Sequence, residues 1–194
     1  DYVIEHRGKE TPEDLLRNAI QYGNFKVFEA SGLAQGVQGM GTTLTMALHR
    51  QGDNRVYVGH VGDSRAYVAL SGTIRQVTED QSITGELLRN GSITEEDAMR
   101  HPGRNVLTAA LGTQESVSAA IYPVDIEGGD VMLLCTDGLT SLVNSKEVLA
   151  LLEMSPSDEA ATRLVGAANA RGGYDNVTVV ILWPEVTASF GAEK

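Results

Sequence analysis

The chain has very little cysteine, few positive charges and no long apolar run, and each of these absences excludes a class of protein. Its 194 residues include a single cysteine, Cys135, so no internal disulfide can form, which is usual in a reducing compartment. No run of about eighteen apolar residues could span a membrane, and the N-terminal residues lack the basic and then apolar pattern of a signal peptide. We therefore expect a cytoplasmic chain with no membrane partner.

Positive charge is scarce: 15 Lys and Arg residues stand against 26 Asp and Glu residues, which gives a formal net charge of −11. A protein that binds the phosphate backbone needs clustered Lys and Arg, so we predict no nucleic-acid partner. An anionic membrane surface would also repel this chain. The hydrophobic fraction of 42% is typical of a soluble globular protein, and the length suits one domain with a sizeable core.

Two apolar runs each adjoin an acidic residue. The run 131–136 ends at Asp137, and Asp175 lies shortly before the run 177–183. Their lengths and the glycines beside them predict two buried strands. If the two strands are antiparallel neighbours, the end of the first and the start of the second lie at one rim, and Asp137 and Asp175 converge there. Adjacent carboxylates raise each other's pKa, and a hard cation such as Mn²⁺ or Mg²⁺ would relieve the repulsion.

Four more short strands precede these two, and helices flank them. The turns between the strands predict an antiparallel meander. Within the run 55–61, alternate residues give two faces that are both partly apolar, so we expect covering layers on both sides and a helix-sheet-sheet-helix order. The expected strands are 42–49, 55–61, 65–70 and 73–77; further extended segments are 104–111 and 117–126; helices are expected to start near Thr11, Ser82, Thr94, Asn144 and Pro156.

From about Gly39 to Trp183 the chain resembles the metal-dependent protein phosphatase family, protein phosphatase 2C-like. The matching segments occur in the family's order: 39–43 (GMGTT), 58–65 (VGHVGDSR), 78–82 (TEDQS), 129–139 (GDVMLLCTDGL) and 173–178 (GYDNVT). The resemblance implies an α+β fold, an antiparallel β-sandwich flanked by helices on both faces. It also implies a serine/threonine phosphoprotein phosphatase in which a water bridging two Mn²⁺ or Mg²⁺ ions attacks phosphoserine or phosphothreonine. Asp137 and Asp175 match metal ligands of the first catalytic ion, and Asp80 matches a ligand of a third ion that Asp137 shares.

One motif of the family has no match before Gly39: Asp-Gly-x-Gly-Gly, whose Asp bridges both catalytic ions. The phosphate-binding arginine of the family has no counterpart either. We therefore expect an N-terminally truncated sandwich, with residues 1–185 as one domain without its first strands and residues 186–194 as a frayed tail. Two functions follow: a phosphatase domain that is weakly active or inactive as this chain alone, or a catalytically impaired regulatory or interaction module. Sheet edges left without neighbours would favour a homodimer.

Several single residues have simpler interpretations beside the functional ones. Either aspartate of the predicted pair could be only a turn former, and Asp80 could be the N-cap of a helix. Asp63 is interpreted mainly as a turn residue, with support of a metal ligand as the minor alternative. His60 is interpreted as core or rim packing, with proton transfer as the functional alternative. Cys135 is interpreted as core packing rather than a nucleophile, and Asn176 as a donor that holds the carboxylate of Asp175.

Overall fold

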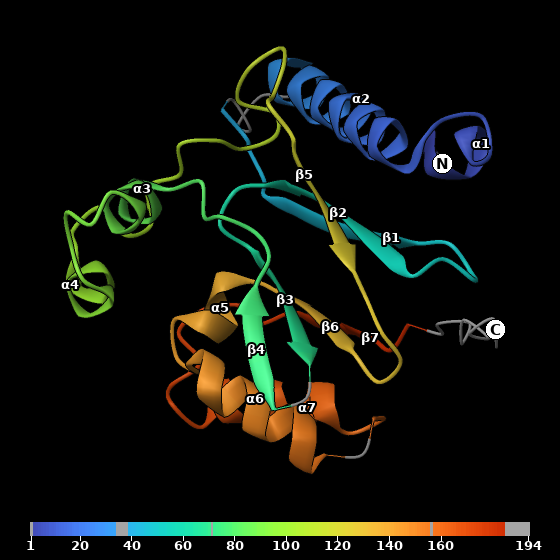
Figure 1. The fold of residues 1–194 in the computed structure, drawn as a ribbon. Coiled ribbons are helices and arrows are strands. Elements are labelled where there is room, and N and C mark those ends of the chain that lie inside the picture. Colours follow the sequence, from blue (N-terminus) through green and yellow to red (C-terminus); the bar gives the residue numbers. More distant parts are fainter. Residues whose placement is uncertain (1, 34–38, 71, 156, 185–194) are drawn as a thin grey trace, which may run out of the picture.

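Two antiparallel sheets lie face to face in the computed structural model, which describes residues 2–33, 39–70, 72–155 and 157–184 (Figure 1). One sheet has the strand order β1-β2-β5 and the other β4-β3-β6-β7. The strands are β1 (Leu44–His49), β2 (Arg55–Val61), β3 (Arg65–Leu70), β4 (Thr73–Gln76), β5 (Ala120–Asp125), β6 (Val131–Cys135) and β7 (Val179–Leu182). The predicted α+β sandwich is confirmed.

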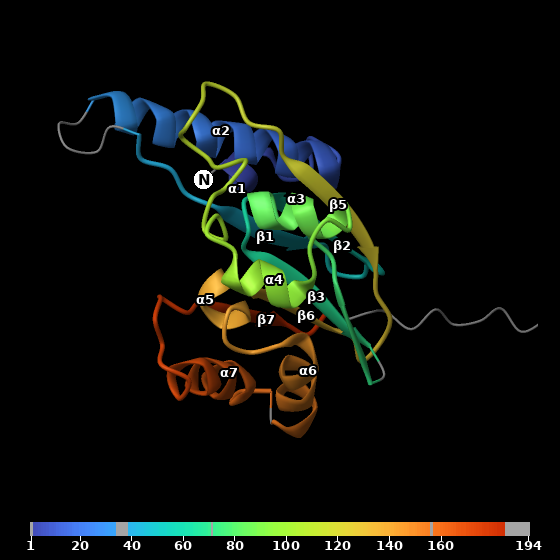
Figure 2. The same ribbon diagram turned by 90° about the vertical axis from the view of Figure 1, so that its left-hand side faces the viewer.

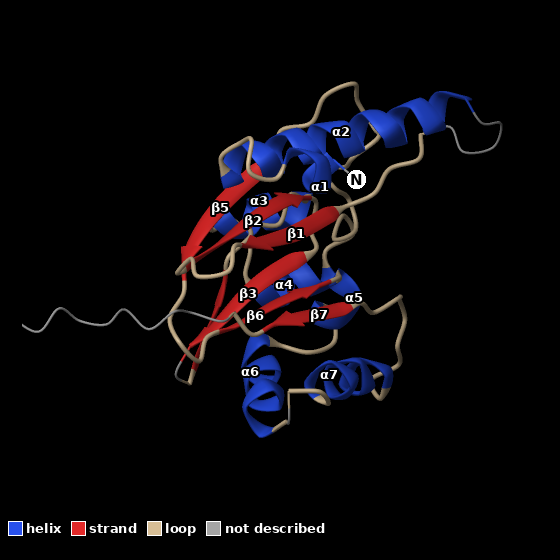
Figure 3. Ribbon diagram, turned by 90° about the vertical axis from the view of Figure 1, so that its right-hand side faces the viewer, coloured by secondary structure: helices blue, strands red, loops and turns tan. Residues whose placement is uncertain are grey.

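Helices cover the outer face of each sheet, which confirms the predicted layer order. Helix α2 (Pro12–Leu33) lies over β1-β2-β5 with the short α1 (Tyr2–His6) beside it, and α6 (Ser145–Met154) and α7 (Ala160–Asn169) lie over the other sheet (Figure 3). Between β4 and β5 the chain forms α3 (Ile83–Arg89) and α4 (Glu95–Arg100), which sit beside the sandwich (Figure 2). The one-turn helix α5 (Asp137–Thr140) directly after β6 was not predicted.

Side-chain caps fix two of the helix starts as predicted. The Thr11 hydroxyl accepts a hydrogen bond from the Asp14 N–H (3.2 Å) at the start of α2. Thr94 and Asp97 form a reciprocal capping box at the start of α4. The segment 104–111 was predicted to be extended, but it contains only isolated bridges, at Leu107 and Leu111. A lone bridge supplies too few ladder hydrogen bonds to make a strand.

Three clusters of buried apolar residues fill the spaces between the layers. One lies between the two sheets and includes Val58, Val68 and Met132. A second joins β3 and β6 to α6 and α7, and a third joins α2 to β1 and β2. Both faces of both sheets are therefore covered, as the apolar faces of the run 55–61 predicted.

The four strands β1 to β4 do not form the single meander that we predicted. The hairpins β1-β2 and β3-β4 are present, but β2 and β3 belong to different sheets. The turn Gly62-Asp63-Ser64 therefore carries the chain across the sandwich and is not a hairpin. Gly62 has a φ of 110°, and a Cβ there would lie 2.4 Å from the Thr43 methyl group, so only glycine fits this crossing.

The strands β1 and β7 are edge strands on the same side of the sandwich, and a cavity of about 290 Å³ lies between them. Its lining is mostly apolar: Thr45, Met46, Ala47, Leu134, Val180, Ile181 and Leu182. Val180 is 55% exposed, so the prediction that the run 177–183 forms a buried strand is wrong. The physical reason is that β7 has no neighbour beyond it among the described residues. The central strand β6 is largely buried, as predicted.

No helix within the described residues is long and apolar enough to cross a bilayer. The predicted frayed tail, residues 186–194, lies outside the described residues.

Candidate functional site

The C-terminal end of β6 and the N-terminal start of β7 meet at one end of the sandwich, which we call the rim. Cys135 is opposite Val179 in the antiparallel ladder. Beyond that pair, the Thr136 N–H donates to the Thr178 carbonyl (3.1 Å), and the Thr178 N–H donates to the Thr136 hydroxyl oxygen (3.0 Å). The two segments that carry Asp137 and Asp175 therefore lie side by side, as the sequence predicted.

Gly138 allows these two segments to approach closely. A Cβ at Gly138 would lie 2.3 Å from the Asn176 carbonyl oxygen, which is closer than atoms can pack. The Thr136 hydroxyl donates to the same carbonyl (3.2 Å). Asp137 and Asp175 each adjoin this contact in the chain. The glycine thus has a steric role that holds the two acidic segments together.

Both carboxylates remain available at the rim. Asp137 is half-buried and Asp175 is exposed, and neither forms an ion pair with any residue that the structure describes. One oxygen of Asp175 accepts a hydrogen bond from the Asn176 main-chain N–H (2.7 Å). We expected a donor from Asn176, and the donor is its backbone N–H. Such a bond is also what a turn-forming aspartate makes, so metal contact by Asp175 stays a prediction.

Asp80 lies in a different environment from the other two. Its carboxylate forms a two-pronged ion pair with Arg65, with Nε–Oδ1 and Nη2–Oδ2 distances of 2.9 Å and 2.7 Å, and Gln76 donates to Oδ1 (3.0 Å). Ser82, whose hydroxyl accepts from the Gly85 N–H, is the N-cap of α3, so the N-cap alternative for Asp80 is wrong. A metal ion at Asp80 would have to bind carboxylate oxygens that already accept hydrogen bonds from Arg65 and Gln76.

Asp63 is the site residue whose importance we did not predict. Strand β3 is antiparallel to β6 with Arg65 opposite Cys135, and this register brings Asp63 toward Asp137. Burial, together with the negative charges of Asp137 and Asp80, raises the pKa of Asp63 to about 6. The sequence signal was the acidic turn between two buried strands, but the pairing of β3 with β6 cannot be read from local pattern.

Cys135 is part of the core, as predicted. It is 4% exposed and packs with the cluster under α6 and α7. Burial raises the pKa of its thiol to about 12, so almost none is thiolate at neutral pH. The nucleophile of cysteine chemistry is the thiolate, and Cys135 does not supply one.

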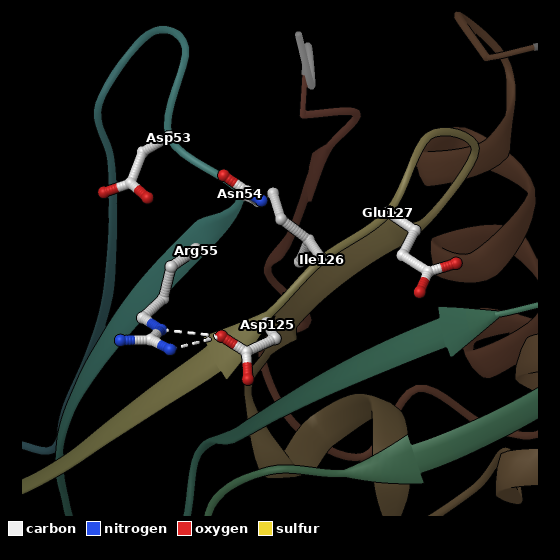
Figure 4. Close-up of a pocket in the computed structure, with 6 residues that line it drawn as sticks. All are labelled: Asp53, Asn54, Arg55, Asp125, Ile126 and Glu127. Carbon is white, nitrogen blue, oxygen red and sulfur yellow. Dashed lines mark hydrogen bonds and ion pairs between the residues drawn. The ribbon is translucent and has the colours of Figure 1, made fainter. Parts of the chain in front are cut away.

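A polar cavity of about 380 Å³ lies at the start of β2 and the end of β5, away from the rim (Figure 4). Arg55 and Asp125 form an ion pair across it, with an Nη2–Oδ1 distance of 2.6 Å. Both side chains are more than a third exposed, and the charges neutralise each other. Asp53 and Glu127 also line this cavity, but it lies outside the sequence segments that resemble the phosphatase family, so we place the candidate site at the rim.

The residues at the rim fit a hard divalent cation only in part. Oxygen ligands are present in Asp137 and Asp175, and the close approach at Gly138 holds their segments together. Within the described residues, no three or more His, Cys, Asp or Glu side chains gather closely enough to hold a metal. Affinity for hard cations rises with the number of charged ligands. Asp137 and Asp175 therefore stay predicted metal ligands.

A family profile described as "Protein phosphatase 2C" matches residues 5–177. The chain belongs to the protein phosphatase 2C family. This match spans most of the chain and includes the rim segments 135–138 and 175–177. It confirms the resemblance seen in the sequence, and with it the assignment to the metal-dependent serine/threonine phosphatases.

Relatives and solved structures agree with the family. The serine/threonine phosphatase stp of Listeria monocytogenes is 38% identical over 179 residues, which are 92% of this chain and 70% of that protein. A crystal structure of the Mycobacterium tuberculosis serine/threonine phosphatase PstP/Ppp matches with a TM-score of 0.82 and 34% identity, over 92% of this chain and 77% of that one. The catalytic domain of PstP in complex with two manganese ions matches with a TM-score of 0.80 and 32% identity, over 92% and 76%.

Proposed function

We propose that this protein phosphatase 2C chain hydrolyses phosphoserine and phosphothreonine in phosphoproteins, with Asp137 and Asp175 as ligands of Mn²⁺ or Mg²⁺. The observation that supports the proposal is the meeting of β6 and β7 at the rim, with the close contact between Gly138 and Asn176. The segments that carry the two carboxylates adjoin paired strands, and one main-chain bond and two bonds of the Thr136 hydroxyl join them. A site built on strand ends keeps its geometry better than one built on loops.

When bound, Mn²⁺ or Mg²⁺ supplies a water of lowered pKa and polarises the phosphoryl oxygens. The protein's own part is orientation. Asp137 begins α5 directly after β6, so its backbone is fixed by the sheet on one side and by the helix on the other. Asp175 is exposed and accessible from solvent, which suits a position beside an incoming phosphorylated side chain. Asp80 is proposed as a ligand of a third ion, in competition with its pairing to Arg65.

The test is release of inorganic phosphate from a phosphothreonine peptide in the presence of Mn²⁺. We expect slow turnover by the wild type and a loss of at least about 10- to 100-fold in Asp137→Asn, because removing a ligand should cost no less than removing a group that supports one. Asp53→Asn in the distant polar cavity is the matched acidic control and should keep the wild-type rate. Equal rates in wild type and Asp137→Asn would contradict the proposal.

The alternative, a catalytically impaired regulatory or interaction module, is not favoured by the relatives, which are named as phosphatases. It predicts that the folded wild type binds a phosphothreonine peptide and Mn²⁺ but releases no phosphate above the rate of Asp137→Asn. The same assay therefore separates the two functions.

We also propose a single domain over residues 1–185, a cytoplasmic signalling role and a homodimer formed through the sheet edges. The free, buried Cys135 supports a reducing compartment. The composition of the edge strands supports a dimer through β7. The edge strands β4 and β5 carry Arg75 and Pro123, and both residues discourage pairing with another chain. The edge strand β7 contains neither charge nor proline. A second copy could pair with β7 in antiparallel register across a two-fold axis.

A further inference from the structure

A buried polar network joins the two sheets next to the rim. Its centre is His60 on β2, which is fully buried. The Nδ1 atom of His60 lies 2.9 Å from the Thr45 hydroxyl of β1, and the Nε2 atom lies 3.2 Å from the Glu79 carbonyl oxygen. The Thr45 hydroxyl also donates to the Ser64 carbonyl (3.2 Å). Ser64 directly precedes β3 and Glu79 follows β4, and both strands belong to the other sheet, so the network reaches from one sheet to the other.

The partners determine where the proton on His60 sits. A carbonyl oxygen can only accept, so Nε2 carries the hydrogen that is donated to Glu79. Burial lowers the pKa of His60, which favours the neutral ring. Nδ1 is then an acceptor, and the single hydroxyl proton of Thr45 is shared between Nδ1 and the Ser64 carbonyl. His60 and Thr45 thus act as one unit that holds two carbonyls.

The two carbonyls held in this way lie beside the acidic residues of the rim. Ser64 stands between Asp63 and Arg65, and Glu79 directly precedes Asp80. Two further bonds join the same turns to each other: the Gly62 N–H donates to the Gln81 side chain (2.9 Å), and the Gln81 N–H donates to the Gly62 carbonyl (2.7 Å). The network therefore fixes the turns from which Arg65 and Asp80 form their two-pronged pair.

Packing alone does not explain a histidine here. Val56 and Val58 precede His60 on the same face of β2 and belong to the cluster between the sheets. A third apolar residue would continue that row without the cost of removing an imidazole from water. The imidazole instead satisfies both of its nitrogens with partners in different layers. A histidine at position 60 is therefore explained by its two hydrogen bonds to the segments around it, and not by packing.

We propose that His60 and Thr45 are positioning residues, which fix the turns of Asp63 and Asp80 and so set the Arg65–Asp80 pair and the acidic groups of the rim around Asp137. The inference rests on the proposed function in one respect, namely that the rim binds a divalent cation. His60 and Thr45 touch neither substrate nor cation in this role. They act through the main-chain carbonyls of Glu79 and Ser64.

The test uses variants that each keep only one of the two hydrogen bonds of the imidazole, either to Thr45 or to Glu79. In His60→Asn the amide can reach Thr45 but not Glu79, and in His60→Gln the amide nitrogen replaces Nε2 and can still donate to Glu79. Thr45→Val keeps the shape of residue 45 and removes its hydroxyl, so it serves if His60→Asn fails to fold. Asn24→Ala is the matched control, because Asn24 is fully buried and its bonds go to Gly112, Gln114 and Glu115.

Two readouts are measured on the folded proteins, below the thermal midpoint of each. The first is the NMR signal of the Arg65 Nε–H, which reports the pair with Asp80 without any metal. The second is the dissociation constant for Mn²⁺ alone, measured by calorimetry. We expect His60→Asn and Thr45→Val to shift the Arg65 signal, to speed its exchange with solvent and to raise the Mn²⁺ dissociation constant on the order of tenfold. His60→Gln should restore both readouts.

Asn24→Ala should lower the thermal midpoint and leave both readouts at their wild-type values. If His60→Asn and Thr45→Val behave like Asn24→Ala, the network only adds stability and the proposal is overturned. If the wild type binds no Mn²⁺, the proposed function fails, while the Arg65 signal still decides whether His60 and Thr45 position the turns.

Discussion

At the scale of single residues, Asp63 shows that the rim costs the fold some stability. Its carboxyl is partly buried among other acidic groups, and its pKa is raised to about 6 from the ordinary value of 3.8. In the unfolded chain it ionises at a lower pH. Between the two pKa values the folded state holds more protons than the unfolded state, so stability falls as pH rises through this window.

Asp63→Asn should therefore stabilise the apoprotein above pH 6 and not below pH 4. The shift corresponds to a gain on the order of 1–3 kcal/mol in the free energy of unfolding at pH 8, since one pKa unit is worth about 1.4 kcal/mol. Urea unfolding of both proteins at pH 8 and pH 4, with EDTA present, measures it. Asp53→Asn, in the turn before β2 and in no ion pair among the described residues, should change stability little at either pH. A gain that is equal at both pH values would show that ionisation of Asp63 is not the cause.

Gly138 makes the contact that brings the two acidic segments together, and it allows a second test. Gly138→Ala places a methyl group where the Asn176 carbonyl lies, so it should destabilise the fold by about 1–3 kcal/mol, as overpacking does. It should also weaken Mn²⁺ binding, because the segments must separate. Gly128→Ala is the control, since a Cβ there meets no atom within 4 Å. Chemical unfolding and calorimetry give both values. Unchanged Mn²⁺ affinity in a folded Gly138→Ala would show that the close approach does not shape the site.

At the scale of elements, local sequence patterns predicted the strands and the helix caps, but they did not predict which strands pair. The apolar runs predicted β2 and β3 to the residue, and Thr11 and Thr94 were correct helix starts. The turn Gly62-Asp63-Ser64 looks the same in sequence whether it closes a hairpin or crosses to another sheet, so β2 was wrongly paired with β3. For the same reason the place of Asp63 beside Asp137 was missed. Asp137 and Asp175 could be predicted together because each apolar run adjoins a recognisable acidic turn, which follows β6 and precedes β7.

The edge strand β7 gives a prediction about self-association. Val180 is half-exposed in an edge without charge or proline, so Val180→Lys should place a charge in the proposed dimer contact and shift the chain toward monomer. Thr73→Lys, also exposed but on the opposite edge strand β4, is the matched control and should leave the association unchanged. Sedimentation equilibrium over a range of concentrations measures both. A wild type that is monomeric at high concentration, or equal effects of the two variants, would contradict pairing through β7.

At the scale of the whole molecule, metal binding and folding are coupled. Asp137 and Asp175 are held near each other only when β6 and β7 are paired, and the unfolded chain has no such arrangement. A ligand that binds only the folded state raises stability in proportion to the logarithm of its concentration. With two carboxylates and a net charge of −11, the chain should bind hard cations weakly, with a dissociation constant on the order of 10⁻⁴ to 10⁻³ M.

Mn²⁺ at ten times that dissociation constant should therefore raise the free energy of unfolding by about 1.4 kcal/mol, which corresponds to about 3–6 °C in the thermal midpoint for a chain of this size. Differential scanning calorimetry of the wild type with increasing Mn²⁺ measures the shift. Asp137→Asn should lose most of it, because one of the two ligand charges is gone, whereas Asp125→Asn, whose carboxylate pairs with Arg55 at the far cavity, should keep it. If Asp137→Asn is stabilised as much as the wild type, the cation binds elsewhere on this acidic surface, and Asp137 and Asp175 are turn residues.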